Sequence, residues 1–541
     1  MTLALLIVMS LWSGAGQRDR PAPTAAPATL MPGLGRLHHP IATKSTEAQR
    51  FFDQGLTLVY GFNHEAAARS FRRAAALDPA SPMPHWGIAL ALGPNINLDV
   101  DPEREKAAYE EAQRAKALTA GAPPNERALA DAIATRYSND SSADLQALAV
   151  QYKDAMREVS RRFPDDLDAA TLFAESLMDL HPWQLWSNDG TPTENTEEIV
   201  AVLESVLRRD PVHVGANHYY IHAVEASSTP ERALASASRL QTLVPAAGHL
   251  VHMPAHIFMR TGDYAGAVAA NARAAQVDRD YIRATKAEGV YPLMYHTHNV
   301  DFLASAAMMT GQFQEAIRAA DELVTKATDA LAEMPMIEPF AAKKLYVLLR
   351  FAKWNDAAAL PQPDAKHAIL SALSHFGRGV AHAALGRVAD AERERAAYLE
   401  VRRAVPAGTP WNLNTAAAMF AVTDAVLDAR MAWAKADKAT AVETWKRAVA
   451  AEDTLNYDEP PDWYYPGRES LGAALYLSGR YEEAERVFRE DLERTPRNGR
   501  SLFGLWQTLL AQKKADAAAM VERQFTAAWS RADVRLRIEE F

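Results

Sequence analysis

Apolar residues recur every three or four positions through most of the chain, which is the spacing of one face of an α-helix. The pattern is clearest between residues 48 and 81, where two such stretches are separated by a short polar turn. Phe51 and Gly55 lie in the first stretch, Ala67 and Phe71 in the second, and Pro79 follows them. Small residues on facing sides allow two helices to approach closely, a phenyl ring fills the remaining gap, and proline ends the second helix. The pattern therefore predicts an antiparallel helical hairpin.

The same register returns in the middle of the chain and near its end. Segments that begin at 214 and 248 are 34 residues apart, as are segments that begin at 465 and 499. The copy at 465 carries the equivalent residues Gly472, Ala484, Phe488 and Pro496. Weaker copies begin near residues 82, 133, 167, 297, 338, 372 and 422. We expect about twelve copies, which together cover roughly three-quarters of the chain.

This register resembles the tetratricopeptide repeat (TPR), which folds as two antiparallel helices in each 34 residues. The resemblance implies an all-α protein, a right-handed TPR α-solenoid of about twelve helix-turn-helix repeats, with a concave and a convex face. We expect helices from about residue 44 to 535, no sheet, and a polar-faced capping helix after about residue 518. In this interpretation the solenoid occupies residues 44–541, with histidine-rich central repeats at 214–330 and C-terminal repeats at 338–541.

Three segments interrupt the period, at residues 93–98, 181–190 and 289–295, and insertions in a solenoid fall on loops that often border a binding face. A segment rich in proline and aromatic residues, 457–466, precedes the repeat at 465, and the segment at 181–190 also carries aromatic residues. Two interpretations of these aromatic residues stay open: they stack on a ligand at the rim of the groove, or they fill gaps between helices. The candidate groove residues are Trp183, Trp186, Trp463, Tyr464 and Tyr465.

The amino terminus has the pattern of an export signal. Residues 3–12 are one apolar run, too short for a comfortable bilayer span, and small residues follow at 13–16. We therefore expect a signal peptide at 1–16, a Pro/Ala-rich flexible linker at 17–43, and a periplasmic or secreted protein. No later segment has 18 consecutive apolar residues, so we expect no transmembrane span in the mature chain.

Composition narrows the chemistry. The 541 residues include no cysteine, which excludes disulfides, thiolate metal sites and cysteine nucleophiles. The formal net charge of −10 argues against a broad nucleic-acid footprint. The sequence also lacks the GxSxG, P-loop, GxGxxG and HExxH motifs, so it offers no signature of the corresponding enzymes.

Histidines concentrate where they would line a groove. In TPR proteins, positions 2, 5, 9 and 12 of each repeat's first helix line the concave face, and this spacing is that of one helical face. With 16 histidines in 541 residues, eight such positions would hold about a quarter of one histidine by chance. In the copies at 214 and 248 they hold five histidines and a glutamate: His218, His222, Glu225, His249, His252 and His256. The copy at 297 adds His298 and Asp301.

Imidazoles one helical turn apart, with carboxylates nearby, suit a transition metal, and without thiolates the candidates are Zn, Fe, Mn or Cu. We expect four rings to point into one cavity: those of His218, His222, His252 and His256. The other candidates, as ligands or as partners of ligands, are Glu225, His249, His298 and Asp301. The alternative is that these histidines hydrogen-bond to a bound peptide or to one another, as a polar lining of the groove.

The stretch from about residue 40 to 535 also resembles a widespread group of exported bacterial TPR proteins without an assigned reaction. The matching tracts include HYYIHAVEAS, AGHLVHMPAHIFMRTGDY and EPPDWYYP. Two functions remain open. One is a metal-binding protein, which could be a metal-dependent enzyme. The other is a non-catalytic scaffold that binds a peptide, protein or small-molecule ligand in its groove, as the TPR resemblance implies. The sequence favours the first, because histidine, glutamate and methionine occupy positions where scaffolds carry arginine, lysine and asparagine.

Overall fold

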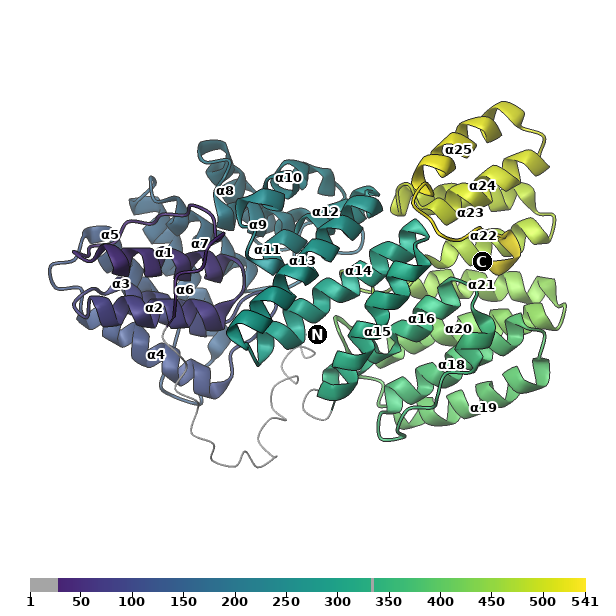
Figure 1. Cartoon of the computed structure of the whole chain (residues 1–541), viewed down its shortest axis with the longest axis horizontal. Coiled ribbons are helices and arrows are strands. Elements are labelled where there is room, and N and C mark those ends of the chain that lie inside the picture. The colour runs from purple at the N-terminus through teal and green to yellow at the C-terminus, as the bar shows by residue number, and fades with distance from the viewer. Residues whose placement is uncertain (1–27, 332–334) are drawn as a thin grey trace. The chain divides into compact units, whose positions relative to one another are not determined.

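The structure, a computed structural model, describes residues 28–331 and 335–541 (Figure 1). The expected signal peptide at 1–16 lies outside the described residues, as does the first part of the expected linker. Within the described part, 25 α-helices make up nearly all regular structure, and neighbouring helices pack in pairs. The prediction of an all-α, TPR-like solenoid fold is confirmed. The chain forms two compact units, the first ending at Pro254 and the second beginning at Ala255.

The first unit contains eleven complete α-helices and one short 3-10 helix. They are α1 (Thr46–Tyr60), α2 (His64–Leu77), α3 (Met83–Leu92), α4 (Pro102–Ala117), α5 (Pro124–Ile133), α6 (Leu145–Arg162), α7 (Leu167–Met178), α8 (Thr196–Arg209), α9 (Val214–Val224), η1 (Pro230–Ala233), α10 (Leu234–Leu243) and α11 (Gly248–His252). Helix α12 (Pro254–Thr261) follows, and the boundary between the units falls just after its first residue.

The second unit continues in the same way. Its α-helices are α13 (Tyr264–Thr285), α14 (His296–Thr310), α15 (Phe313–Ala330), α16 (Lys343–Arg350), α17 (Trp354–Ala358), α18 (Ala368–Ala384), α19 (Val388–Ala404), α20 (Ala416–Ala434), α21 (Lys438–Glu452), α22 (Gly467–Leu477), α23 (Tyr481–Arg494), α24 (Gly499–Ala511) and α25 (Ala515–Ala528). The smaller elements are η2 (Tyr291–Tyr295), η3 (Pro335–Ala342), β1 (Pro410–Trp411), β2 (Asn414–Thr415) and η4 (Ile538–Glu540).

The repeat register works through a phenyl ring held between two glycines. The ring of Phe71 is fully buried, and a Cβ atom on either Gly55 or Gly87 would lie 2.6 Å from it. These glycines come from α1 and α3, so the ring on α2 spaces three consecutive helices. This packing explains why the sequence alternates small and aromatic residues at fixed positions.

The same device recurs in the second unit and leads to a prediction. A Cβ atom at Gly472 would lie 2.6 Å from the buried ring of Phe488, which also faces Gly504. We expect Gly472→Ala to lower the free energy of unfolding of this unit by about 1–3 kcal/mol, because the ring has no free space to move into. Gly408→Ala is the control, since no atom lies within 4 Å of a Cβ there. Urea denaturation checks both variants; equal stabilities would refute this account of the packing.

Two details of the sequence prediction were wrong. A repeat was expected to begin near residue 133, but α5 ends at Ile133 and α6 begins only at Leu145. The intervening tract contains Ser138–Ser142, whose serine and aspartate groups favour turns over helix. No sheet was expected, but β1 and β2 pair antiparallel. Asn412 between them has a φ of 45°, a left-handed conformation that asparagine tolerates better than most residues.

The described part of the Pro/Ala-rich segment, residues 28–43, packs on the helices of the first unit. The amide of Met31 donates to Gln54 Oε1 at 2.7 Å, and Gln54 Nε2 donates to the carbonyl of Thr29 at 3.0 Å. Further along, the amide of Ala246 donates to the carbonyl of Gly33 at 3.0 Å. This segment therefore forms part of one wall of the first unit, and it brings His38 and His39 to the helices.

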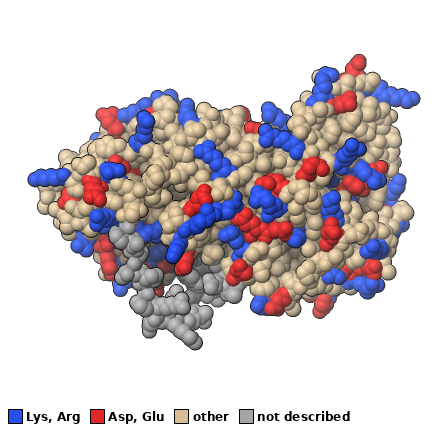
Figure 2. All heavy atoms as spheres, viewed as in Figure 1, with Lys and Arg blue, Asp and Glu red and all other residues tan. Residues whose placement is uncertain are grey.

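The surface carries both signs of charge. On the face shown in Figure 2, lysine and arginine side chains are interspersed with aspartate and glutamate. None of the described helices combines the length and apolar character that a bilayer span requires.

One half-buried carboxyl predicts a pH dependence of stability. Burial raises the pKa of Glu452 to about 8, although its Oε2 accepts the amide hydrogen of Gly467 at 2.8 Å. At a pH between about 4.5, the pKa of this group in the unfolded chain, and about 8, its pKa in the native state, the native protein holds a proton that the unfolded chain has released. Stability should therefore fall as pH rises through this window, by at most about 1.4 kcal/mol per pH unit from this group.

Glu452→Gln should remove this contribution and make the unfolding free energy of the second unit less dependent on pH. The amide oxygen of glutamine can still accept from Gly467, so the local structure should survive. Chemical denaturation at pH 5 and pH 8 measures the effect. A variant with the same pH dependence as the wild type would show that Glu452 titrates normally.

Candidate metal centre

Two helices of the first unit bring three histidines together. Helix α9 carries His218 and His222 one turn apart on one face, and α11 carries His249. Gly215 allows α9 to approach α1 closely, because a Cβ there would lie 2.5 Å from the ring of Tyr60. The small residue at the start of α9 is therefore what places His218 against the end of α1.

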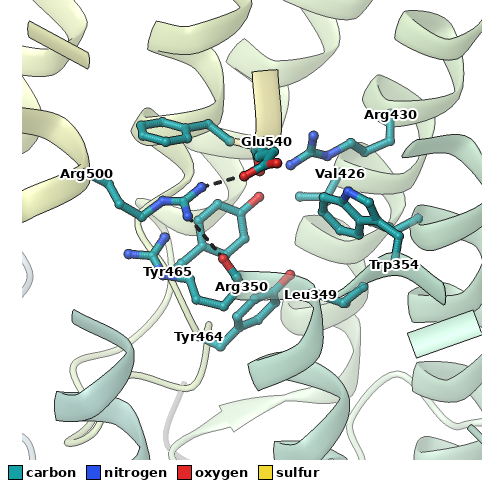
Figure 3. A pocket seen from close by; sticks show the side chains of 11 residues that line it. Leu349, Arg350, Trp354, Val426, Arg430, Tyr464, Tyr465, Arg500 and Glu540 are labelled. Atoms are coloured by element: carbon teal, nitrogen blue, oxygen red, sulfur yellow. Dashed lines mark hydrogen bonds between the residues drawn. The ribbon is translucent and has the colours of Figure 1, made fainter. Parts of the chain in front are cut away.

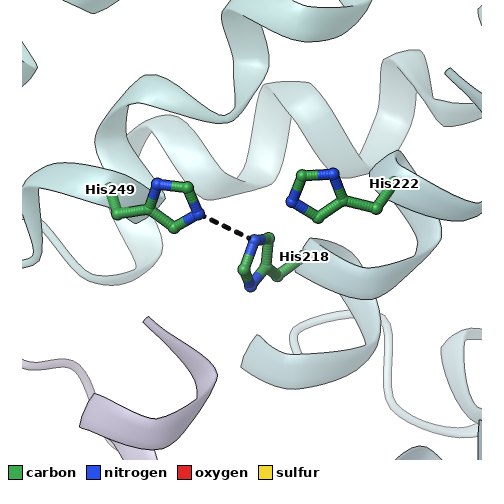
Figure 4. A group of neighbouring side chains, drawn as sticks. All are labelled: His218, His222 and His249. Carbon is green, nitrogen blue, oxygen red and sulfur yellow. Dashed lines mark hydrogen bonds between the residues drawn. The ribbon is translucent and has the colours of Figure 1, made fainter. Parts of the chain in front are cut away.

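The three imidazoles face a common point (Figure 4). The Nε2 atoms of His218 and His249 are 3.2 Å apart. One ring nitrogen from each of His218, His222 and His249 can be chosen so that all three lie within 4.8 Å of one another. The centroid of the His218 ring lies 4.9 Å from that of His222 and 5.0 Å from that of His249. We call these three residues the histidine triad.

The outward nitrogens of two triad members have oxygen partners. His218 Nδ1 donates to the backbone carbonyl of Tyr60 at 2.6 Å. His222 Nδ1 donates to Glu225 Oε1 at 2.7 Å, with both side chains almost fully buried. These bonds place the proton on Nδ1 in each ring, so that the neutral ring carries its lone pair on Nε2. Carbonyl and carboxylate partners of this kind orient histidine ligands in metal sites.

Aromatic rings enclose the triad. The ring centroid of Phe62 lies 4.6 Å from that of His218 and 5.2 Å from that of His249. The rings of Trp183 and His222 are nearly perpendicular, with centroids 5.6 Å apart. Both Phe62 and Trp183 have a positive φ, of 53° and 60°. The triad residues are 0%, 5% and 1% exposed in the order His218, His222 and His249. Such an apolar surround strengthens electrostatic interactions at the centre.

The remaining predicted ligands are placed as follows. His252 is in the first unit, with its ring 5.6 Å from that of His249. His256 and His298 are in the second unit, where their rings lie 5.8 Å apart and both pack on Phe302. Asp301, also in the second unit, forms an ion pair with Lys343 at 2.5 Å. Of the eight candidates, the first unit brings together His218, His222 and His249, with Glu225 as a hydrogen-bond partner.

The aromatic candidates take different positions. Trp183 lies beside the triad, and Trp186 donates its indole N–H to the carbonyl of Ala223 at 2.8 Å. Trp463 and Tyr465 belong to the hydrophobic core of the second unit, and the ring of Tyr464 stacks on that of Tyr346 at 4.5 Å.

A second polar cluster was not expected from the sequence. Asp168 on α7 accepts three hydrogen bonds: from His39 Nδ1 at 2.8 Å, from Tyr60 Oη at 2.6 Å and from His213 Nε2 at 3.2 Å. Burial alone would raise the pKa of Asp168, but the bonds from His213 and His39 outweigh it and hold this pKa well below its usual range. Burial alone would lower the pKa of His39, but the hydrogen bond to Asp168 and the charge of this carboxylate outweigh burial, so the pKa of His39 is raised.

Tyr60 connects this cluster to the triad. Its hydroxyl donates to Asp168, while its backbone carbonyl accepts from His218. Asp168 and His39 also line a cavity of about 1230 Å³ in the first unit, together with residues of the 33–40 segment. No sequence signal marked this cluster, because an aspartate at a helix start is usually a cap and His39 lies 129 residues from Asp168.

No protein-family model matches the chain, and no curated protein sequence matches it. Solved structures with a similar course of helices include a human IFIT1 dimer with m7Gppp-AAAA, at 11% identity and a TM-score of 0.34, covering 90% of this chain and 91% of that one. Another is the TPR domain of P58(IPK), at 12% identity and a TM-score of 0.22, covering 87% of this chain and 99% of that one. At these values the likeness concerns the TPR-like helical architecture alone.

Proposed function

We propose that the protein binds a divalent transition metal ion, with zinc as the first candidate, through the histidine triad. The observation that carries this proposal is the 3.2 Å separation of the Nε2 atoms of His218 and His249. A tetrahedral zinc ion with nitrogen ligands at about 2.0–2.1 Å holds two such nitrogens roughly 3.3–3.4 Å apart. The observed spacing is therefore already close to that of two ligands of one ion.

The partners of the outward nitrogens support the same proposal. A histidine can bind a metal only through a nitrogen that carries a lone pair. The carbonyl of Tyr60 and the carboxylate of Glu225 fix the Nδ1 protons of His218 and His222, and so direct the Nε2 lone pairs inward. The carboxylate of Glu225 also adds negative charge behind His222, which raises the basicity of this ligand.

The setting favours a retained ion with a structural role over a turnover site. The triad joins α9 to α11, and its rings are almost fully buried. A metal there would tie two helices and the end of α1 together. Three protein ligands would leave a fourth position, which is also the arrangement of catalytic zinc sites. Catalysis by this protein therefore requires a path for substrate to that position.

The experiment is elemental analysis of the full chain, purified without a histidine tag, followed by titration of the metal-free protein with zinc. We expect about one metal ion to bind to each chain, and we expect this binding to require the histidine triad. His222→Ala and His249→Ala should each abolish binding while leaving the helix content unchanged. His382→Ala, on α18, is the matched control and should bind normally. Zinc binding that persists in both triad variants would refute the proposal.

Ligand binding at the cavity beside Asp168 is a second candidate function. It is supported by the cavity volume of about 1230 Å³ and by the oriented His39 and Asp168 side chains on its wall. Pockets that hold small molecules usually measure about 300–1,000 Å³ and have a few convergent polar groups, so this cavity has more than enough room for one. Native mass spectrometry of the purified protein should detect a bound molecule that His39→Ala and Asp168→Ala release. A spectrum without any bound molecule, before and after incubation with cell extract, would contradict it.

We further propose that the protein is exported, on the basis of its amino-terminal sequence. The mature chain should begin between about Ala15 and Arg20, after the small residues that follow the apolar run. Intact-mass measurement of the protein from a periplasmic or culture fraction checks this. A chain that retains Met1 in the cytoplasmic fraction would be the opposite result.

A further inference from the structure

Two carboxyl groups meet at the end of α7 in the first unit. Glu175 and Asp179 are one helical turn apart, so their side chains leave the same face of the helix. Glu175 is 4% exposed, and the side chain of Asp179 is 6% exposed. The two groups, which we call the carboxyl pair, are hydrogen-bonded to each other. Because an ionised carboxylate can only accept, this bond requires a proton on one of them.

One cation accompanies the carboxyl pair. Arg136, which follows α5, is almost fully buried, and its Nη2 donates to Asp179 Oδ2 at 2.6 Å. The same nitrogen donates to the carbonyl of Pro94 at 3.1 Å. One guanidinium neutralises one carboxylate, so a doubly ionised pair would leave a buried negative charge over. Such a charge is strongly unfavourable, and a shared proton removes it without needing a cavity.

The helices packed against α7 bring no second cation to the pair within the described chain. Helix α6 contributes Tyr152 and α9 contributes Tyr219, and both residues are 1% exposed. Burial raises the pKa of both hydroxyls above its usual range, so neither is charged at neutral pH. The residues that α8 buries carry no charge.

The groups behind Arg136 do not change this balance. Tyr137 lies beside the guanidinium and donates its hydroxyl to the carbonyl of Ala89 at 2.8 Å. Beyond it, α4 carries one group of each sign, Arg104 and Glu105, and both act on Tyr137. His64 on α2 is neutral, because burial lowers its pKa to about 3.

The oxygen atoms of the pair indicate where the proton lies. Glu175 Oε2 and Asp179 Oδ1 are both buried, and no donor group of the described chain reaches either atom. A proton between these two oxygens would satisfy both at once. Burial raises the pKa of each carboxyl, and repulsion from Glu175 raises that of Asp179 further, while Arg136 opposes the rise in both.

The carboxyl pair also lies where two of the segments that interrupt the repeat meet. Arg136 binds the carbonyl of Pro94 in the 93–98 segment, and Asp179 caps α7 just before the 181–190 segment. The ring of Trp183, in the second of these segments, packs against that of His222. Two negative charges in the last turn of α7 would repel each other and the negative end of the helix dipole.

We propose that Glu175 and Asp179 share one proton at neutral pH and act as a pH-sensitive switch on the end of α7 and the 181–190 segment. With the proton, the pair holds the last turn of α7 closed on Arg136. Without it, repulsion opens this turn and loosens the segment that carries Trp183. The native pair keeps a proton that the unfolded carboxyls release by about pH 4.5, so the stability of the first unit falls as pH rises from there toward the raised pKa of the pair.

Infrared spectroscopy of the metal-free full chain at pH 7 tests the shared proton, because protonated carboxyls and carboxylates absorb at different frequencies. Asp179→Asn and Glu175→Gln should each remove one protonated carboxyl, and the double variant should remove one protonated carboxyl and one carboxylate. Asp131→Asn, at a half-exposed side chain on α5, is the matched control and should remove a carboxylate only. Single variants that lose only a carboxylate, or a double variant that loses two protonated carboxyls, would overturn the proposal.

Hydrogen exchange of residues 176–190, corrected for the intrinsic pH dependence of amide exchange, tests the switch. We expect exchange in the wild type to accelerate between pH 6 and pH 9, by at most about tenfold per pH unit. In Asp179→Asn, the amide can donate to Glu175 and accept from Arg136, so protection should no longer depend on pH. The same pH dependence in both proteins would refute the switch. Should Asp179→Asn fold poorly, Glu175→Gln makes the same comparison. Both measurements use metal-free protein, so neither depends on the proposed zinc site.

Discussion

Glu469→Ala should destabilise the second unit by about 3–5 kcal/mol, the range typical for removing one partner of a buried ion pair. Glu469 is fully buried, forms ion pairs with Arg350 and Arg500, and accepts a hydrogen bond from Asn498. Burial would raise its pKa, but the two arginines hold this pKa below its usual value, so the group is charged in the native state. Its removal leaves two guanidinium groups facing each other without this counter-charge.

Urea denaturation with hydrogen exchange of α22 and α24 measures this effect. The control is Glu483→Ala, on α23, which breaks a more exposed ion pair with Arg480. It should lower the free energy of unfolding by less than about 1 kcal/mol. Glu469→Gln separates charge from shape, because it keeps the side-chain volume and the acceptor for Asn498. A loss below about 1 kcal/mol for Glu469→Ala would mean that water or rearranged side chains replace the carboxylate at little cost.

The helical architecture was predictable because it depends on short-range regularities. The glycine and phenylalanine positions repeat at a fixed spacing, and each marks a close contact between neighbouring helices, such as that of Gly55 with Phe71. A pattern of this kind is visible without knowledge of distant contacts. The boundaries were less predictable, as the missing repeat near residue 133 shows, since a polar turn leaves no periodic signal.

The candidate site was predictable only in part. The register placed His218 and His222 on one face of the same helix, and the structure has both on α9 with their ring centroids 4.9 Å apart. It assigned His249 a secondary role behind His252, although His249 is the residue whose Nε2 lies 3.2 Å from that of His218. The reason is that α11 ends at His252 after only five residues, so the ideal register of a continuous first helix does not apply there.

Contacts across long stretches of sequence could not be predicted at all. Tyr60 reaches His218 over 158 residues, and Arg350 reaches Glu469 over 119. A buried arginine and a surface arginine look alike in a sequence, and only the fold reveals that Arg350, Arg430 and Arg500 line one small cavity of the second unit (Figure 3). The same holds for His39, which the sequence placed in a linker and the structure places against Asp168.

Zinc should raise the free energy of unfolding of the first unit by several kcal/mol. This is the second of the two largest effects that we expect. An ion that binds only the folded state adds about 4 kcal/mol when its free concentration is a thousand times its dissociation constant. The effect should appear as a higher unfolding midpoint and slower hydrogen exchange in α9 and α11, and a chelator should reverse it. His249→Ala should eliminate it.

Glu225→Gln distinguishes metal binding from simple packing of the imidazoles. Its carboxylate holds His222 Nδ1 at 2.7 Å and does not belong to the triad itself. If the triad binds zinc, the substitution should weaken zinc binding about 10- to 100-fold, as for other partners of metal ligands, while one ion per chain still binds at saturation. If the rings only hydrogen-bond to one another, Glu225→Gln should change stability equally with zinc and with chelator. Isothermal titration of both proteins decides between these results, because only the first raises the fitted dissociation constant for zinc at unchanged stoichiometry.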